Sequence, residues 1–194
     1  MATQNKVVEV EVEVEGLAPG MLMHKFGIET EAALVKSSRG AGKAKVDPKK
    51  EAENSAYRLD NGDLYQPAEH IFQVMVKAAA GFQISGRGKK TYKDCVKGLL
   101  AVTPEYIPHL TPKGEHVKDY EIDSRAVRIQ SARVIRHRPL LREWRLAFHL
   151  TTKDTELLPI TVIQEILTEA GRMYGIGDYR PRYGTFRVTK FKEI

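Results

Sequence analysis

The segment from residue 171 to residue 184 carries the residue types best suited to hold a chain of phosphates. Glycine lets the backbone adopt positive φ and approach a ligand closely. The arginine guanidinium offers a rigid fork of donors that matches phosphate oxygens. The segment therefore predicts contact with a nucleic-acid backbone. The candidate binding residues in it are Gly171, Arg172, Gly175, Gly177, Arg180, Arg182 and Gly184.

A second interpretation of this segment stays open. The glycines could merely end a helix and reverse the chain, while the arginines lie in solvent. For Gly171 alone we favour that interpretation, but the combination with three arginines favours phosphate contact. Because the segment follows the C-terminus of an expected helix, the helix dipole does not attract an anion there. Side chains and loop amides would have to bind it.

A second set of arginines lies between residues 125 and 145, with no lysine among them. Arginine used in this way suggests bidentate or stacking contacts. The alternative is pairing with acidic residues across a sheet, which we weigh most for Arg128 and Arg145. We expect Arg136 and Arg138 to extend the nucleic-acid groove. The full set is Arg125, Arg128, Arg133, Arg136, Arg138, Arg142 and Arg145.

Two further basic stretches, 36–50 and 87–97, suit electrostatic capture that carries little sequence information. Either could instead be a solubilising surface. The cations that we single out as binding candidates are Lys43, Lys45, Arg87, Lys89 and Lys90.

The sequence offers thin support for catalysis. Its six histidines have no spacing typical of a metal site, and no phosphate-binding loop of nucleotide hydrolases is present. We therefore expect no metal and no cofactor. His24, with a nearby loop lysine, is a weak candidate for metal-independent RNA cleavage by general acid–base chemistry.

Composition narrows the partner and the compartment. The net charge of +6 over 194 residues favours a polyanionic partner. Cys95 is the only cysteine, which fits a reducing cytoplasm. No apolar run approaches the length of a membrane span, and we see no signal-peptide core at the N-terminus. The expected setting is cytoplasmic, away from membranes.

The elements that must position these residues follow from periodicity. Valines and glutamates alternate over 8–15, which is typical of a strand with one buried face. Helices are expected after Pro67 and after Pro159, and strands over 125–136, over 144–150 and at the end of the chain. The order strand, helix, strand, strand, helix, strand predicts an α+β, ferredoxin-like antiparallel sheet with helices on one face.

We expect a single domain over 1–194. Within it, 31–56 reads as a mobile basic loop, because its lysines and arginines have no periodic apolar partners. We expect 83–120 to be an insertion that holds a short helix from Thr91 to Leu100 and then an irregular stretch marked by prolines.

Two places in the chain resemble the RAMP superfamily of CRISPR-associated RNA-binding proteins. Residues 10–23 are similar to that family's first strand and following turn, and residues 170–188 to its C-terminal glycine-rich loop and last strand. The likeness covers about a quarter of the chain, and Gly184-Thr185-Phe186 lacks the family's closing glycine. The resemblance implies a ferredoxin-like fold and RNA binding rather than cutting. A phage or mobile-element relative outside any CRISPR complex would match equally.

The leading hypothesis is thus a non-catalytic protein that binds RNA, or single-stranded DNA, as a homo-oligomer or as a subunit of a ribonucleoprotein. The alternatives are a metal-independent endoribonuclease that uses His24, and a phage protein–protein module whose basic loops dock on an acidic partner.

Overall fold

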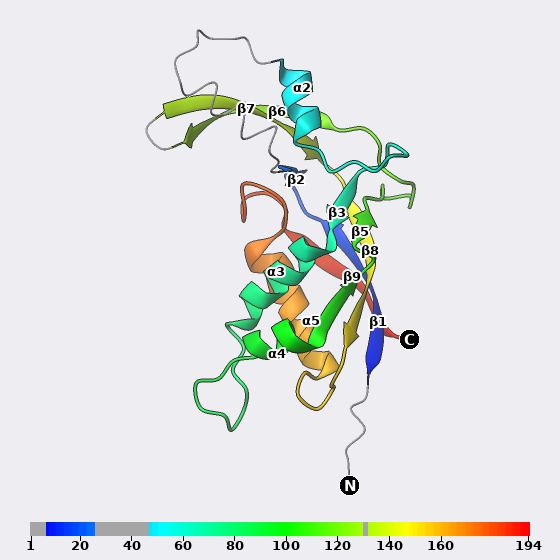
Figure 1. The fold of residues 1–194 in the computed structure, drawn as a ribbon, viewed down its shortest axis with the longest axis vertical. Helices are drawn as coiled ribbons and strands as arrows, with labels where there is room; N and C mark the ends of the chain where they lie inside the picture. Colours follow the sequence, from blue (N-terminus) through cyan, green and yellow to red (C-terminus); the bar gives the residue numbers. More distant parts are fainter. Residues whose placement is uncertain (1–6, 26–46, 130–131) are drawn as a thin grey trace.

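The computed structural model describes residues 7–25, 47–129 and 132–194. It is an α+β protein with antiparallel sheets, which confirms the expected fold class at that level. Figure 1 shows a body of helices packed on a sheet and a long hairpin that reaches away from it.

The body is built on a four-stranded antiparallel sheet in the order β4-β8-β1-β9. The predicted first strand is confirmed, and its valines Val10, Val12 and Val14 are fully buried while the glutamates between them are not. Because successive side chains of a strand point to opposite faces, this alternation buries one face of the sheet. The strands are β1 (Val8–Gly16), β4 (Leu100–Thr103), β8 (Arg145–Thr152) and β9 (Phe186–Glu193).

Helices cover the valine face of the sheet (Figure 1). In α3, apolar residues at helical spacing, such as Ile71 and Met75, are buried, and in α5 Ile163 and Leu167 are. No helix in the described part of the chain is long and apolar enough to cross a membrane. The helices of the body are α3 (Ala68–Ala79), α4 (Lys93–Leu99), α5 (Ile160–Glu169) and a π-helical turn, η1 (Ala170–Tyr174).

The opposite, helix-free face of the sheet carries ion pairs between neighbouring strands. Arg187 bonds Glu15 at 2.7 Å, and Lys190 lies 2.6 Å from Glu11. Arg145 lies 3.9 Å from Glu13, so of the two interpretations of Arg145 the pairing with the acidic strand is confirmed. These cross-strand pairs neutralise the glutamates of β1.

A second unit holds the hairpin. It is a three-stranded sheet in the order β2-β7-β6, and α2 packs against β7. A two-stranded sheet of β3 and β5 lies between this unit and the body (Figure 1). The elements are β2 (Met21–Leu22), α2 (Pro48–Asn54), β3 (Tyr65–Pro67), β5 (Tyr106–Pro108), β6 (Glu121–Ile129) and β7 (Ala132–Leu141).

Two predictions about the middle of the chain are wrong. The segment 125–136 is not one strand of the main sheet but parts of β6 and β7, which pair from Ile129↔Ala132 outward. The strand beside β8 is instead β4, inside the supposed insertion 83–120. Four residues of β4 directly follow α4, and this run is too short to show a period of two.

The expectation of a loop over 31–56 needs a similar correction. Residues 31–46 lie outside the described residues, but 48–54 form α2. The Asp47 carboxylate accepts a hydrogen bond from the Lys49 N–H at 2.9 Å and Pro48 occupies the first turn, both typical of a helix start. Ala52 is the only buried residue of α2. The helix therefore has no stripe of apolar residues from which the sequence could have predicted it.

Candidate nucleic-acid interface

The glycine–arginine loop (residues 171–184) is pinned to the connection between β1 and β2. The Asp178 N–H donates to the Leu22 carbonyl at 2.7 Å, and the Gly184 N–H donates to the Gly20 carbonyl at 2.8 Å. The Ile176 N–H closes the loop on the Gly184 carbonyl at 2.9 Å. Figure 1 shows the loop beside β2, at the foot of the hairpin. Its backbone is therefore held in place by the fold itself.

The glycines of the loop lie against the chain's own backbone. Gly177 and Gly184 have φ of 81° and 79°; a Cβ at Gly177 would lie 2.5 Å from the Leu22 oxygen, and one at Gly184 would overlap the Ile176 oxygen. A Cβ at Gly175 would lie 2.7 Å from the Gly184 oxygen, and one at Gly171 would overlap the Phe186 oxygen. The expectation that these glycines open the backbone to a ligand is thus corrected. They allow the loop to pack.

Arg138 ties the loop to the hairpin. Its side chain is buried, and its Nη1 donates to the Asp178 carboxylate at 2.5 Å; the Asp123 carboxylate lies 3.9 Å from its Nη2. Burial raises the pKa of Asp178, but the hydrogen bonds from Arg138 and from the Tyr179 N–H lower it overall. The prediction that Arg138 lines a groove is therefore wrong: its charge is used inside the protein.

Two tyrosines of the loop stack on Arg125 of β6. The Arg125 guanidinium carbon lies 4.7 Å from the centre of the Tyr183 ring and 5.1 Å from that of Tyr179, and Nη2 donates to the Tyr183 hydroxyl at 2.6 Å. Tyr179 is 44% exposed and has φ of 59°, a region that non-glycine residues seldom occupy. Such backbone strain is concentrated at functional sites. The fold thus presents an aromatic face beside cations.

Arg180 and Arg182 are the cations of the loop that stay available. Both side chains are exposed, and neither forms a hydrogen bond or an ion pair with another residue in the described ranges. Arg172 is exposed too, but it bonds Glu169 at 2.8 Å. The loop therefore turns two unneutralised guanidinium groups toward solvent.

His24 contacts Arg136 of β7. Arg136 Nη1 donates to His24 Nε2 at 2.9 Å. Burial, and then the charge of Arg136, lower the pKa of His24, while Asp178 opposes them. Because Nε2 already accepts a hydrogen bond, it is not poised to take a proton from a substrate. Arg136 shares one face of the hairpin with Arg125, its cross-strand partner.

The remaining basic candidates are not brought to this place. Arg87, Lys89 and Lys90 are exposed on the loop between α3 and α4, which the Ile84 N–H closes on the Lys90 carbonyl at 2.9 Å. Figure 1 shows that loop at the far end of α3 from the glycine–arginine loop. A twelve-residue helix is about 18 Å long, so one short contact cannot include both. Lys43 and Lys45 lie outside the described residues.

Sequence reasoning missed the aromatic neighbour of Arg180. His70 lies in the first turn of α3, edge-to-face with Tyr57 at 5.5 Å between ring centres. Burial, and then the nearby charge of Arg180, lower the pKa of His70. Nothing in the sequence around His70 points to the loop a hundred residues later. A lone Asp178 in a basic stretch, by contrast, was a signal that one arginine would be paired.

Comparison with known proteins adds no information about this site. No protein-family model matches the chain, and no curated protein matches it.

Over the ranges that the structure describes, no three His, Cys, Asp or Glu side chains gather in a way that could hold a metal ion.

Proposed function

We propose that this protein is a non-catalytic RNA-binding protein that grips the sugar–phosphate backbone with its glycine–arginine loop. The observation that carries the proposal is the state of Arg180 and Arg182, which stay exposed and unpaired among the described residues. Their loop is packed into a fixed shape. Guanidinium groups held on a fixed backbone suit phosphate oxygens, which they bind through charge-assisted hydrogen bonds.

Neighbouring side chains extend the contact. Tyr179 offers a partly exposed ring on which a base can stack, a contact that is worth about 1–3 kcal/mol per base in single-strand binders. Arg136 adds positive charge at the foot of the hairpin. Phosphate contacts and stacking together favour RNA or single-stranded DNA over a duplex, since bases in a duplex are not free to stack on a protein.

We also propose that the protein belongs with the RAMP superfamily, and the order of its elements supports this. In the body, the chain order is β1, α3, β4, β8, α5 and β9, and the sheet order is β4-β8-β1-β9. Both agree with a ferredoxin-like arrangement, in which the second and fourth strands are the edges. The proposed setting is a cytoplasmic ribonucleoprotein of the CRISPR type in which several copies bind along one RNA.

Binding rather than cleavage is proposed because of His24. Its Nε2 is engaged by Arg136, and its burial disfavours the protonated form that a general acid needs.

The test compares two double variants that remove the same charge. Replacing Arg180 and Arg182 by alanine should weaken binding of a fluorescent single-stranded RNA about 30- to 100-fold in anisotropy titrations, since two charge-assisted contacts are lost. The slope of log K against log salt should fall by about 1.4, or about 0.7 for each phosphate contact.

The control variant replaces Arg145 and Arg187, which are already paired with Glu13 and Glu15. We expect its affinity for RNA to stay within about threefold of wild type. These two arginines are already neutralised by glutamates, and exposed ion pairs contribute little to the stability of the fold. Equal losses in both variants would show that net charge alone, and not the loop, binds RNA. No binding by the wild-type protein would end the proposal.

A further inference from the structure

The loop between α3 and α4, which we call the distal basic loop (residues 80–92), projects from the body at the end opposite the hairpin (Figure 1). Two consecutive turns form its tip. The Arg87 N–H donates to the Ile84 carbonyl at 3.1 Å, and the Lys90 N–H donates to the Arg87 carbonyl at 3.3 Å. Hydrogen bonds within the loop therefore give the tip a defined backbone shape, although it lies away from the core.

The glycines of this tip leave the backbone open, unlike those of the glycine–arginine loop. Gly86 and Gly88 have φ of 73° and 61°, and a Cβ at either position would have no atom of a non-neighbouring residue within 4 Å. The consecutive N–H groups of Gly88 and Lys89 donate to no acceptor in the described ranges. Free N–H groups that follow one another in a turn form a concave site for an anion.

Cations are concentrated on this loop and on α4, the helix that follows it. The stretch from residue 87 to residue 99 has five cations and one carboxylate, that of Asp94. All five cations are exposed, and none forms an ion pair or a hydrogen bond through its side chain with another described residue. They therefore present positive charge that the protein itself does not neutralise. The five are Arg87, Lys89, Lys90, Lys93 and Lys97.

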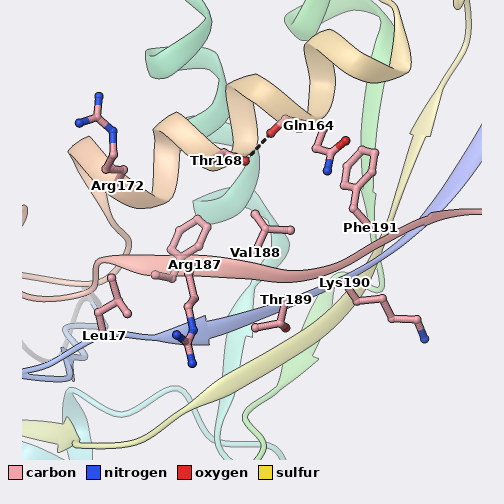
Figure 2. A pocket seen from close by; sticks show the side chains of 10 residues that line it. Leu17, Gln164, Thr168, Arg172, Arg187, Val188, Thr189, Lys190 and Phe191 are labelled. Atoms are coloured by element: carbon pink, nitrogen blue, oxygen red, sulfur yellow. Dashed lines mark hydrogen bonds between the residues drawn. The ribbon is translucent and has the colours of Figure 1, made fainter.

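Another cation-lined surface of the body differs in this respect. Figure 2 shows the groove between α5 and β9, which is lined by Arg172, Arg187 and Lys190. Each of these three side chains pairs with a glutamate, at 2.8 Å, 2.7 Å and 2.6 Å between nitrogen and oxygen. An anion would reach these cations only by displacing a carboxylate, whereas the cations of the distal basic loop need no such exchange.

About one helix length separates the distal basic loop from the glycine–arginine loop. The distal basic loop follows the C-terminal end of α3. At the other end of α3, His70 lies close enough to Arg180 for that charge to lower its pKa. The twelve residues of α3 rise about 18 Å. Because phosphates of a stacked strand follow one another at about 3.4 Å, about five or six nucleotides of one strand bridge the two loops.

We propose that the distal basic loop is a second phosphate-binding site, which holds a further stretch of the same RNA strand. This inference rests on the proposed function, since it takes the glycine–arginine loop as the first contact. The free N–H groups of Gly88 and Lys89 receive one phosphate, and the five cations attract its neighbours. No large apolar side chain of this loop is exposed, so the loop has nothing to insert into a lipid surface. Because one strand joins both contacts, affinity rises with RNA length.

The first experiment replaces Arg87, Lys89 and Lys90 by glutamine in the full chain. In anisotropy titrations at about 0.1 M salt, this triple variant should bind a fluorescent single-stranded RNA of about 20 nucleotides at least about tenfold more weakly than wild type. The slope of log K against log salt should fall by about 2, or about 0.7 for each phosphate contact.

The control variant removes the same charge by replacing Arg142, Arg187 and Lys190 with glutamine. These cations are already paired with Glu121, Glu15 and Glu11. We expect the affinity of the control for the same RNA to stay within about threefold of wild type. The inference is overturned if the two triple variants lose the same affinity, because net charge alone would then explain the loss.

Amide chemical shifts of the ¹⁵N-labelled chain separate a failure of this inference from a failure of the proposed function. With one RNA of about 20 nucleotides per protein, the amides of Gly88, Lys89 and Arg180 should all shift. An RNA of about three nucleotides is too short to reach both loops. It should therefore shift the Arg180 amide of wild type and of the distal triple variant with affinities that agree within about twofold.

Shifts of the Arg180 amide without those of Gly88 and Lys89 would overturn this inference and leave the proposed function standing. Shifts of Gly88 and Lys89 without that of Arg180 would overturn both, since the glycine–arginine loop would not be a contact. The inference is also overturned if phosphatidylserine vesicles sediment the wild-type protein but not the distal triple variant, and the RNA of about 20 nucleotides does not release it. The loop would then be a membrane contact.

Discussion

The helix-free face of the main sheet and the glycine–arginine loop are both rich in arginine and lysine, yet they use these residues differently. On the sheet, Arg187 and Lys190 each reach a glutamate of β1. At the loop, Asp178 pairs with Arg138 of β7, whereas Arg180 and Arg182 of the loop have no such partner within the described chain. The number of cations does not distinguish the two regions. The two regions differ in whether a carboxylate lies within reach of each cation.

This difference separates the arginines that pair within the fold from those that we propose to bind RNA. A paired cation contributes to the fold and repels no neighbour, but a phosphate can recruit it only by displacing its carboxylate. An unpaired cation on a backbone fixed by packing is ready for an anion. The predictions below test the comparison.

The largest effect is expected from Arg138, which is buried, although its partner Asp178 is partly exposed. Arg138→Met leaves Asp178 and Asp123 without their shared cation and should lower the free energy of unfolding by about 3–5 kcal/mol. Arg187→Met breaks an exposed pair and should cost at most about 1 kcal/mol. Urea denaturation followed by circular dichroism measures both. Similar small losses would mean that Arg138 does not anchor the loop.

A smaller effect is expected from the loop backbone. Gly184 and Gly86 have similar φ, 79° and 73°, but only at Gly184 would a Cβ meet other atoms, those of Ile176. Gly184→Ala should therefore cost about 3 kcal/mol, from strain together with displacement of the chain. Gly86→Ala, on the distal basic loop, should cost about 1 kcal/mol, from strain alone. Thermal unfolding of the two variants is the measurement, and equal costs would contradict the packing of the loop.

The smallest effect is expected from His109, whose protonated form would have no partner among the described residues of the body. His109 is fully buried, neither ring nitrogen has a hydrogen-bond partner in the described chain, and burial lowers its pKa to about 3. The unfolded chain takes up this proton near pH 6.5 and the folded one does not, so stability is complete above pH 6.5 and falls as the pH drops.

Between pH 7.5 and pH 5 the loss should be about 2 kcal/mol for this group. His24 and His70, whose pKa values burial also lowers, add to it in the same direction. His109→Leu should reduce the pH slope by about one proton, measured as urea midpoints across that range. An unchanged slope would show that His109 is protonated in the folded protein.

Periodicity predicted the elements that bury a stripe or a face. The alternation in β1 and the helical spacing of Ile71, Val74, Ile163 and Leu167 could be read directly, because each such element contacts the core along most of its length. β4 and α2 could not, since β4 has four residues and α2 buries only Ala52. The alternation over 125–136 predicts one strand, whereas the structure divides this segment between the paired strands β6 and β7.

By itself the sequence determined the composition of the candidate site and the core strand and helices that support it, since residue type and period are local properties of the chain. Tertiary structure alone decided which arginines remain available. Arg138 and Arg180 look alike in sequence, but only Arg138 lies where Asp178 can reach it. Whether a charge is neutralised depends on a carboxylate within a few ångströms, and residues forty positions apart come that close only through the fold.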